Sequence, residues 1–402
     1  MQAIQSVAPP LLQNLLKQAD IEINGPRPFD IQIHDKRIYD AVLARWSLGL
    51  GEAYTAGYWE CEQLDELIAR LLKIGIDQGY SGAARLRLLA HHLRYRLFNL
   101  QSPVRAYEVG RRHYDLGNDL FECMLDSRMI YSCAYWEHAE NLEDAQTDKC
   151  RLICEKLELK PGERVLDIGC GWGGLAAYAA THYGVQVHGI TVSREQLALA
   201  QSRYSDLPIT FELADYRDLV GTYDKIVSVG MFEHVGTANY KSYFDSVARM
   251  LKPEGLFLLH TIGADITTTA TDPWIDRYVF PNGKIPGAVE LVSALEGRLL
   301  VQDWHNFGPD YDRTLMAWDS NFCRRWNEIR LGYGDQFFRM WRYYLRSCAG
   351  YFRSGRGQLW QLVLTRPDRK SSYRSFRFGR ASGRAVSPQV PSAAHAAADS
   401  GI

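Results

Sequence analysis

The chain has 402 residues, a formal net charge of -1, and apolar and charged fractions of 46% and 23%, values that are ordinary for a globular protein. This balance excludes a molecule steered as a whole to nucleic acid or to an anionic membrane, so any such attraction must come from a local patch. No apolar run approaches the roughly 18 residues of a membrane-spanning helix, no signal peptide is apparent, and the eight cysteines form no C-x-x-C pair, which argues against a zinc site and favours a reduced, cytoplasmic protein.

We expect a small α/β domain over residues 1–105, with a structural or dimerising role. It contains no acid–base cluster and no nucleotide loop. In chain order, its predicted elements are a helix at 11–19, strands at 21–23 and 29–33 around a turn, a helix at 36–44, a turn at 49–51 and a helix at 64–74.

Residues 82–113 are strongly basic. Seven arginines and three histidines face one acid, Glu108, and leucines recur at helical spacing. A basic amphipathic helix of this kind can lie on an anionic bilayer. More often, such a helix packs its apolar side on the core and leaves its charges in water, so both interpretations stay open.

Residues 165–174 are the centre of the sequence. A short apolar run leads to Asp167 and then to glycines at 169, 171, 173 and 174, and a helical pattern follows at 175–182. Glycine permits the sharp turn and the close approach to a ligand that the strand–turn–helix unit of a nucleotide fold requires. A glycine turn alone is weak evidence, because ordinary turns share it.

The segments after this turn do not suit a dinucleotide. The next predicted strand ends in Thr191, with Gln196 one helical turn later, so no acid is placed to hold a dinucleotide ribose, and no second glycine turn follows. The third strand ends in Asp215 and Tyr216, an acid and a ring that suit the amino group and the face of an adenine. We predict an S-adenosylmethionine methyltransferase; the alternative is a Rossmann-like sheet with an ordinary turn.

Two more polar side chains follow strands of the same sheet, Glu233 after the fourth and His260 after the fifth. Parallel strands joined by helices share one carboxyl edge, where ligands bind in open α/β sheets. A single Glu or His there is usually structural, whereas two beside a glycine loop favour a functional site. The aromatic insertion at 272–283 is expected beside this site, as the roof of an apolar tunnel.

The fold class predicted from these elements is α/β: a Rossmann-like class I methyltransferase sheet with helices on both faces, plus the small N-terminal α/β domain. The catalytic domain is expected over 106–370, followed over 371–402 by a disordered basic tail rich in Ser, Ala and Pro. The predicted elements are strands at 165–168, 185–190, 209–213, 225–229, 256–259 and 299–304, a last antiparallel strand at 359–364, and helices at 142–157, 239–251, 314–329 and 336–352.

The sequence resembles the bacterial cyclopropane-fatty-acyl-phospholipid synthases over about residues 10–365. The motifs that carry the resemblance occur in the family's order, at 113–118, 131–136, 165–174, 230–236, 258–263, 272–274, 303–308 and 311–318, with 47–52 in the first domain. Mycolic-acid cyclopropane synthases share the later motifs but lack a comparable first domain, which favours the phospholipid enzyme.

The resemblance implies that the methyl of S-adenosylmethionine is added across a cis double bond of an unsaturated acyl chain in a membrane phospholipid. The expected cofactor-binding residues are Tyr131, Ser132, Asp167, Gly169, Gly171, Gly173, Thr191, Gln196, Asp215 and Tyr216. A bicarbonate ion serves as the base in this family, and the residues expected to hold it here are Cys133, Glu233, His260, Tyr311 and the backbone of Ile262. No metal site is expected.

The reaction leaves a carbocation on the acyl chain, which water would quench. An apolar, aromatic lining is therefore expected, with Tyr135, Trp136, Phe232 and Tyr278 as candidates. With a lipid substrate, the domain at 1–105 is expected to dock on the lipid or the membrane, or to dimerise. The expected partners are the phospholipid bilayer, contacted peripherally, and a second copy in a homodimer, with no nucleic acid. The expected location is the cytoplasm, at the inner face of the cytoplasmic membrane.

Three other functions are compatible with the sequence. One is a related methyltransferase that leaves a methyl or methylene branch, because the fate of the carbocation separates the two products. The second is a methyltransferase for a soluble small molecule, which the apolar insertion argues against. The third is a non-enzymatic lipid-binding protein, which the intact Glu233 and His260 argue against.

Overall fold

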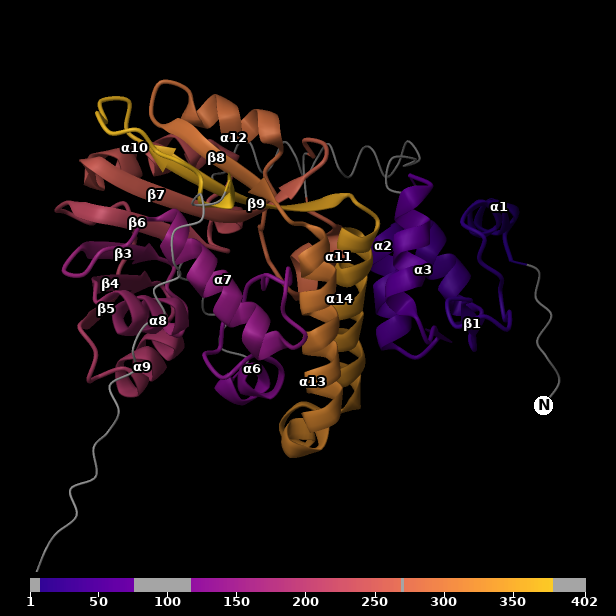
Figure 1. The fold of residues 1–402 in the computed structure, drawn as a ribbon. Helices are drawn as coiled ribbons and strands as arrows, with labels where there is room; N and C mark the ends of the chain where they lie inside the picture. Colours follow the sequence, from indigo (N-terminus) through magenta and orange to yellow (C-terminus); the bar gives the residue numbers. More distant parts are fainter. Residues whose placement is uncertain (1–7, 76–116, 269–270, 379–402) are drawn as a thin grey trace, which may run out of the picture.

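A computed structural model describes residues 8–75, 117–268 and 271–378 (Figure 1). Its centre is a seven-stranded sheet with strand order β5-β4-β3-β6-β7-β9-β8. Neighbours among β3 to β7 pair in parallel, and β9 runs antiparallel to both β7 and β8, which confirms the predicted sheet. The strands are β3 (Arg164–Ile168), β4 (Gln186–Thr191), β5 (Ile209–Leu213), β6 (Tyr223–Val229), β7 (Leu251–Ala264), β8 (Leu300–Asn306) and β9 (Gly357–Thr365).

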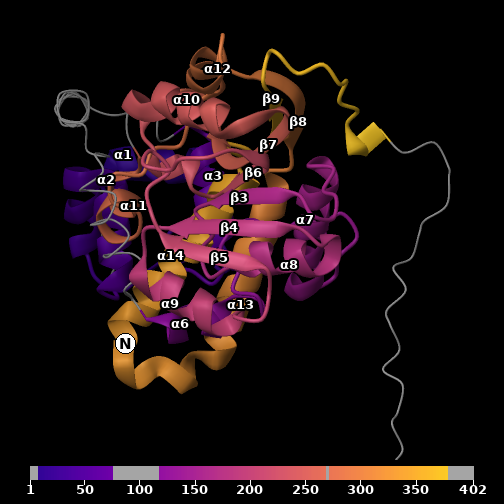
Figure 2. The ribbon, with the colours of Figure 1, turned by 90° about the vertical axis from the view of Figure 1, so that its left-hand side faces the viewer.

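Helices cover both faces of the sheet, as expected (Figure 2). In β7, Leu256 and Leu258 pack in one hydrophobic cluster, and Phe257 and Leu259 pack in another on the opposite face. This alternation follows from the two-residue period of a strand. The first face carries α7 (Leu142–Lys156), α8 (Gly174–Tyr183) and α9 (Arg194–Arg203), and the second carries α10 (Tyr240–Met250) and α12 (Ala288–Leu295).

Two long helices, α13 (Pro309–Tyr333) and α14 (Asp335–Arg353), lie between the sheet and the N-terminal helices (Figure 1). The turn between them uses Gly334, whose φ of 80° lies in the left-handed region that glycine favours. Helix α13 begins earlier than predicted because Pro309, which lacks a backbone N–H, suits a first helical turn. Two short helices, α6 (Asn118–Met124) and α11 (Pro273–Tyr278), flank the pair.

The N-terminal segment shares a hydrophobic core with α14. Trp59, Leu64 and Leu67 are fully buried in the same cluster as Trp341 and Tyr343. Around this core lie α1 (Pro10–Gln18), β1 (Gln32–Ile33), α2 (Arg37–Thr55), β2 (Trp59–Glu60) and α3 (Leu64–Lys73). The buried carboxylate of Asp65 accepts hydrogen bonds from Arg346 and Arg353 of α14, which ties α3 to that helix.

Two local predictions for this segment are wrong. The turn expected at 49–51 lies inside α2, where Gly51 is needed for close packing: a Cβ there would come within 2.4 Å of the Trp274 ring. The break in α2 falls instead at Trp46, whose φ is 50°. Of the two strands expected at 21–23 and 29–33, only the end of the second forms a strand, β1, and it pairs with β2. The expected pairing of the two with each other is reduced to one isolated bridge between Ile23 and Ile31.

Several predictions concern the edges of the described chain. The basic stretch at 82–113 and the boundary at 105 lie outside the described residues. The chain is described to residue 378, beyond the predicted tail boundary at 371, and Arg377 forms an ion pair there with Asp303. Over the described ranges, no helix has both the length and the apolar character needed to cross a membrane.

Candidate active site

The glycine turn after β3 adopts the conformation that its sequence predicts. Gly169, Gly171 and Gly173 have φ values of 81°, 56° and 84°, in the left-handed region. The N–H groups of Gly169 and Cys170 donate to Ile190 O of β4, each over 2.9 Å, which holds the turn against the next strand. A Cβ at Gly171 would meet nothing within 4 Å, so the backbone there is open to a ligand.

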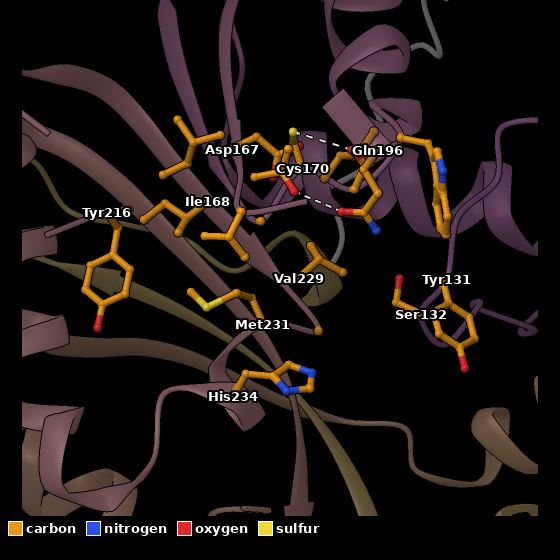
Figure 3. A pocket seen from close by; sticks show the side chains of 18 of the residues that line it. Tyr131, Ser132, Asp167, Ile168, Cys170, Gln196, Tyr216, Val229, Met231 and His234 are labelled. Carbon is orange, nitrogen blue, oxygen red and sulfur yellow. Dashed lines mark hydrogen bonds between the residues drawn. The ribbon is translucent and has the colours of Figure 1, made fainter. Parts of the chain in front are cut away.

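A pocket lies at the carboxyl edge of β3 to β6 (Figure 3). It brings together nine of the ten expected cofactor-binding residues: Tyr131, Ser132, Asp167, Gly169, Gly171, Thr191, Gln196, Asp215 and Tyr216. Gly173 does not line it. A Cβ at Gly173 would come within 2.6 Å of the Phe211 ring, so this glycine permits close packing under the turn.

The polar groups of this pocket are held by neighbours. Thr191 donates its Oγ1 hydroxyl to Gln196 Oε1 over 2.9 Å, and the Arg217 guanidinium donates to both oxygens of Asp215. Tyr131 and Ser132 lie across the pocket from Tyr216 (Figure 3). Burial raises the pKa of Asp167 to about 7, so a cationic ligand group would favour its ionised form.

Lys149 of α7 also lines the pocket and was not among the residues predicted from the sequence. Its side chain is buried, its Nζ donates to Ser132 Oγ over 2.6 Å, and burial lowers its pKa to about 8. Within the described part of the chain, no carboxylate lies at ion-pair distance from it. The sequence does contain a pattern that indicates burial of this lysine. One helix face, defined by three- and four-residue spacing, carries Gln146, Lys149, Ile153 and Lys156. Polar residues on an otherwise apolar stripe indicate buried partners.

The five residues expected at the base site come from four parts of the chain and lie together. Glu233 is in the 3-10 helix η2 (Phe232–His234) after β6, and His260 and Ile262 are on β7. Cys133 precedes α7, and Tyr311 lies in the first turn of α13. Both pack with Ile262 around Phe307, whose ring centroid is 5.8 Å from that of His260.

Two polar atoms in this group are buried without a partner among the described residues: Glu233 Oε2 and His260 Nε2. The other oxygen of Glu233 accepts the Ile262 N–H over 2.7 Å, and His260 Nδ1 lies 3.1 Å from Gln361 Nε2. Burial raises the pKa of Glu233 to about 7 and lowers that of His260 well below its usual range, so the imidazole is neutral. Unpartnered buried polar atoms indicate a place for a ligand.

The proposed aromatic lining divides into site and core residues. Tyr135 packs on Phe307, with ring centroids 5.3 Å apart, and Trp136 donates to Thr314, whose Oγ1 is 3.9 Å from Cys133 Sγ. Phe232 instead stacks on Tyr240 in the cluster under α10. Tyr278 is partly exposed and bonds to Glu52 of the N-terminal segment. The first two therefore adjoin the site, whereas Phe232 is a core residue.

The strand order, the glycine turn and the pocket at its edge define a class I S-adenosylmethionine-dependent methyltransferase. No group of His, Cys, Asp or Glu that could hold a metal ion occurs in the described ranges. The chain belongs to the cyclopropane synthase family: the family model described as mycolic acid cyclopropane synthetase matches residues 101–362.

Individual relatives agree with this assignment. The cyclopropane-fatty-acyl-phospholipid synthase of Escherichia coli (strain K12) is 52% identical over 363 residues, which cover 89% of this chain and 93% of that protein. The cyclopropane synthase MmaA2 from Mycobacterium tuberculosis superimposes with a TM-score of 0.61 and 31% identity. The mycolic acid cyclopropane synthase CmaA1 complexed with SAH and CTAB gives 0.61 and 29%. Each of these two structures covers 64% of this chain and 97% of its own length.

Proposed function

We propose that this enzyme transfers the methyl group of S-adenosylmethionine to a cis double bond of an acyl chain in a membrane phospholipid. The products would be a cyclopropane ring and S-adenosylhomocysteine. We choose a phospholipid as the substrate because of how much of the chain each similarity covers. The Escherichia coli phospholipid enzyme matches 89% of this chain, whereas the two mycobacterial structures cover 64% of it and nearly all of themselves. A match that covers 89% of 402 residues must extend into the chain before residue 101, where the family model begins.

The pocket residues fit S-adenosylmethionine. Gly171 leaves the backbone open toward the pocket, Asp167 offers a buried carboxylate to a cationic group, and Tyr216 offers a ring. The cofactor, when bound, supplies a sulfonium methyl that is already activated. The side chains of this enzyme therefore have to bind the two reactants, align them and keep water away, rather than activate a nucleophile.

A bicarbonate ion at the Glu233–His260 site is the proposed base. Bicarbonate has charged oxygens that need donors and a hydroxyl that needs an acceptor, and the two unpartnered atoms supply one of each. His260 and Tyr311 would donate, and Glu233 Oε2 would accept. Ile262 N–H already bonds to Glu233 Oε1, so we assign it to holding that carboxylate in place. Burial raises the pKa of Cys133 well above its usual range, which suits a weak donor and not a nucleophile.

The proposed methyl transfer and ring closure require no oxidant or reductant. As the C–S bond breaks, the alkene electron pair forms a new C–C bond to the methyl carbon, and positive charge develops on the neighbouring chain carbon. A proton then leaves that methyl for the base, and the C–H electron pair closes the ring. Water would convert the cation to an alcohol, so the buried Trp136 and the ring of Tyr135 beside the site help by excluding it.

We also propose that the enzyme meets its substrate as a homodimer on the inner face of the cytoplasmic membrane. Residues 82–113 carry seven arginines against one acid, and anionic lipid would attract such a segment. Replacing Arg94 and Arg96 by Glu should reduce sedimentation with anionic vesicles and leave binding to S-adenosylmethionine unchanged. Equal sedimentation of the variant and the parent would refute the membrane contact, and a monomer mass in light scattering would refute the dimer.

Deletion of residues 1–100 is the more obvious test of the N-terminal segment, and we expect it to abolish turnover on vesicles. It would also remove Tyr54 and Trp59, whose rings lie against Tyr343 of α14. A large apolar surface would then be exposed, so loss of folding would be mixed with loss of docking. The paired arginine substitutions avoid this problem because they leave Tyr54 and Trp59 in the chain.

The chemical structure of the lipid product distinguishes cyclopropanation from the alternative functions. Purified enzyme with unsaturated phospholipid vesicles, S-adenosylmethionine and bicarbonate should yield lipid that has gained one CH2 and lost its olefinic protons, as seen by mass spectrometry and proton NMR. Gain of CH2 with unsaturation retained would indicate a branching methyltransferase of the same fold. Bound cofactor without any transfer would refute an enzymatic role on this lipid.

A further inference from the structure

A polar row crosses three neighbouring strands beside the proposed base site. His260 on β7 and His305 on β8 are both register partners of Gln361 on β9, so the three side chains lie on one face of the sheet. Val363, two residues after Gln361, and Leu258, two residues before His260, pack in the cluster that α7 covers, which places this face under α7. Gln361 and His260 are buried, so the hydrogen bonds of this row are shielded from water.

Lys156, the last residue of α7, reaches into this row. Its Nζ lies 2.8 Å from Gln361 Oε1, 3.1 Å from His305 Nδ1 and 3.6 Å from Asp303 Oδ2. An ammonium group only donates hydrogen bonds, and Asp303 supplies a countercharge. Burial lowers the pKa of Lys156 to about 7, and the neutral amine would still have two N–H groups for the same two partners. Lys156 therefore determines the orientation of the Gln361 side-chain amide, with the amide oxygen facing Lys156.

The orientation of Gln361 in turn determines the tautomer of His260. With its oxygen on Lys156, the amide turns its Nε2 toward His260 Nδ1, 3.1 Å away. An amide NH2 donates, so Nδ1 must accept, and the proton of the neutral imidazole must sit on Nε2. Nε2 is the buried atom without a partner among the described residues.

We propose that Lys156 and Gln361 are positioning residues that hold His260 in its Nε2–H tautomer, so that this N–H donates to the anionic base. The assignment rests on the proposed base site, because it explains why a donor is needed at Nε2. In the opposite tautomer a lone pair would face the anion, and a favourable contact would become a repulsive one. Neither residue touches the reacting atoms, so each acts only through His260.

The test combines a spectroscopic measurement with kinetics on the full chain. In enzyme with 15N-labelled histidine, long-range proton–nitrogen correlation should assign the Nε2–H tautomer to His260, identified by its absence in His260→Asn. Gln361→Met and Lys156→Met should each lose the single-tautomer signature. In both, the bicarbonate concentration for half-maximal rate should rise about tenfold, as expected for a lost neutral hydrogen bond. The dissociation constant of S-adenosylmethionine should stay unchanged.

The matched control is Gln302→Met, since Gln302 on neighbouring β8 bonds to Thr365 and not to this row. It should keep both the tautomer and the bicarbonate dependence. The double variant Gln361→Met/Lys156→Met should behave like Gln361→Met alone, because Lys156 acts through Gln361; additive effects would refute the relay. An Nδ1–H tautomer in the parent would overturn the proposal. The NMR reading needs no bicarbonate, so it is independent of whether the proposed base is correct.

Discussion

Replacing Glu233 by Gln should inactivate the enzyme and at the same time stabilise it at alkaline pH. Burial raises the pKa of this carboxyl from 4.5 to about 7, and each pH unit is worth about 1.4 kcal/mol, so ionised Glu233 costs the fold about 3 kcal/mol. The folded state binds the proton more tightly than the unfolded state. The stability contributed by the protonated form is therefore complete below pH 4.5 and is lost as the pH rises through about 7.

The Gln variant removes this loss. Its amide oxygen can still accept the Ile262 N–H, so the local structure has no reason to collapse. Urea denaturation at pH 5 and pH 8 should show the variant gaining about 2 to 3 kcal/mol on the parent between the two pH values. Its kcat should fall about 100-fold or more, because an amide NH2 would now face the hydroxyl of the anion.

The comparison of variant with parent cancels the titration of every other group. Glu140→Gln, on an exposed turn, controls for the loss of one carboxylate. A stability difference that is the same at pH 5 and pH 8 would refute a Glu233 that titrates near 7. An active Glu233→Gln enzyme would refute its role as acceptor for the anion.

Two further predictions concern the cofactor pocket and the N-terminal segment. Lys149→Met should weaken binding of S-adenosylmethionine about tenfold by calorimetry, since it removes a buried cation that holds Ser132; an unchanged dissociation constant would exclude Lys149 from the cofactor site. Gly51→Ala should lower the free energy of unfolding by about 1–3 kcal/mol, because its Cβ would overlap the Trp274 ring. Gly332→Ala is the matched control, since it meets nothing within 4 Å, and it should cost nothing.

Much of the sheet could be predicted from the sequence because each strand carries its own signal. The apolar runs are short and bounded by turns, and helical patterns alternate with them, so parallel pairing follows from the connections alone. The N-terminal segment was harder. Gly49 and Gly51 signal a turn locally, yet the packing of Trp274 against α2 requires a residue without a side chain. A glycine that serves close packing cannot be distinguished from a turn glycine by its neighbours in sequence.

The candidate site also contains residues that the sequence could predict and residues that it could not. Glu233 follows β6, and His260 of β7 pairs with Val229, the last residue of β6, so topology alone brings the two together. Gln361 and Lys156 are 205 residues apart in sequence, and they meet only because β9 is inserted between β7 and β8. Side chains that support the reacting groups from behind, as these do, carry no motif. The lysines of α7 were nevertheless detectable as polar residues on an apolar helix face.

The position of Tyr343 on α14 has a consequence for how enzymes of this family differ in length. This side chain is buried between Tyr54, Trp59 and Trp274, and two of these three rings belong to the N-terminal segment. A shorter homologue without that segment would leave the same ring in water, so selection would favour a polar or smaller residue there. The residue aligned with Tyr343 should therefore indicate whether a homologue has the N-terminal segment. Across the family tree, loss of the segment and substitution at this position should occur together.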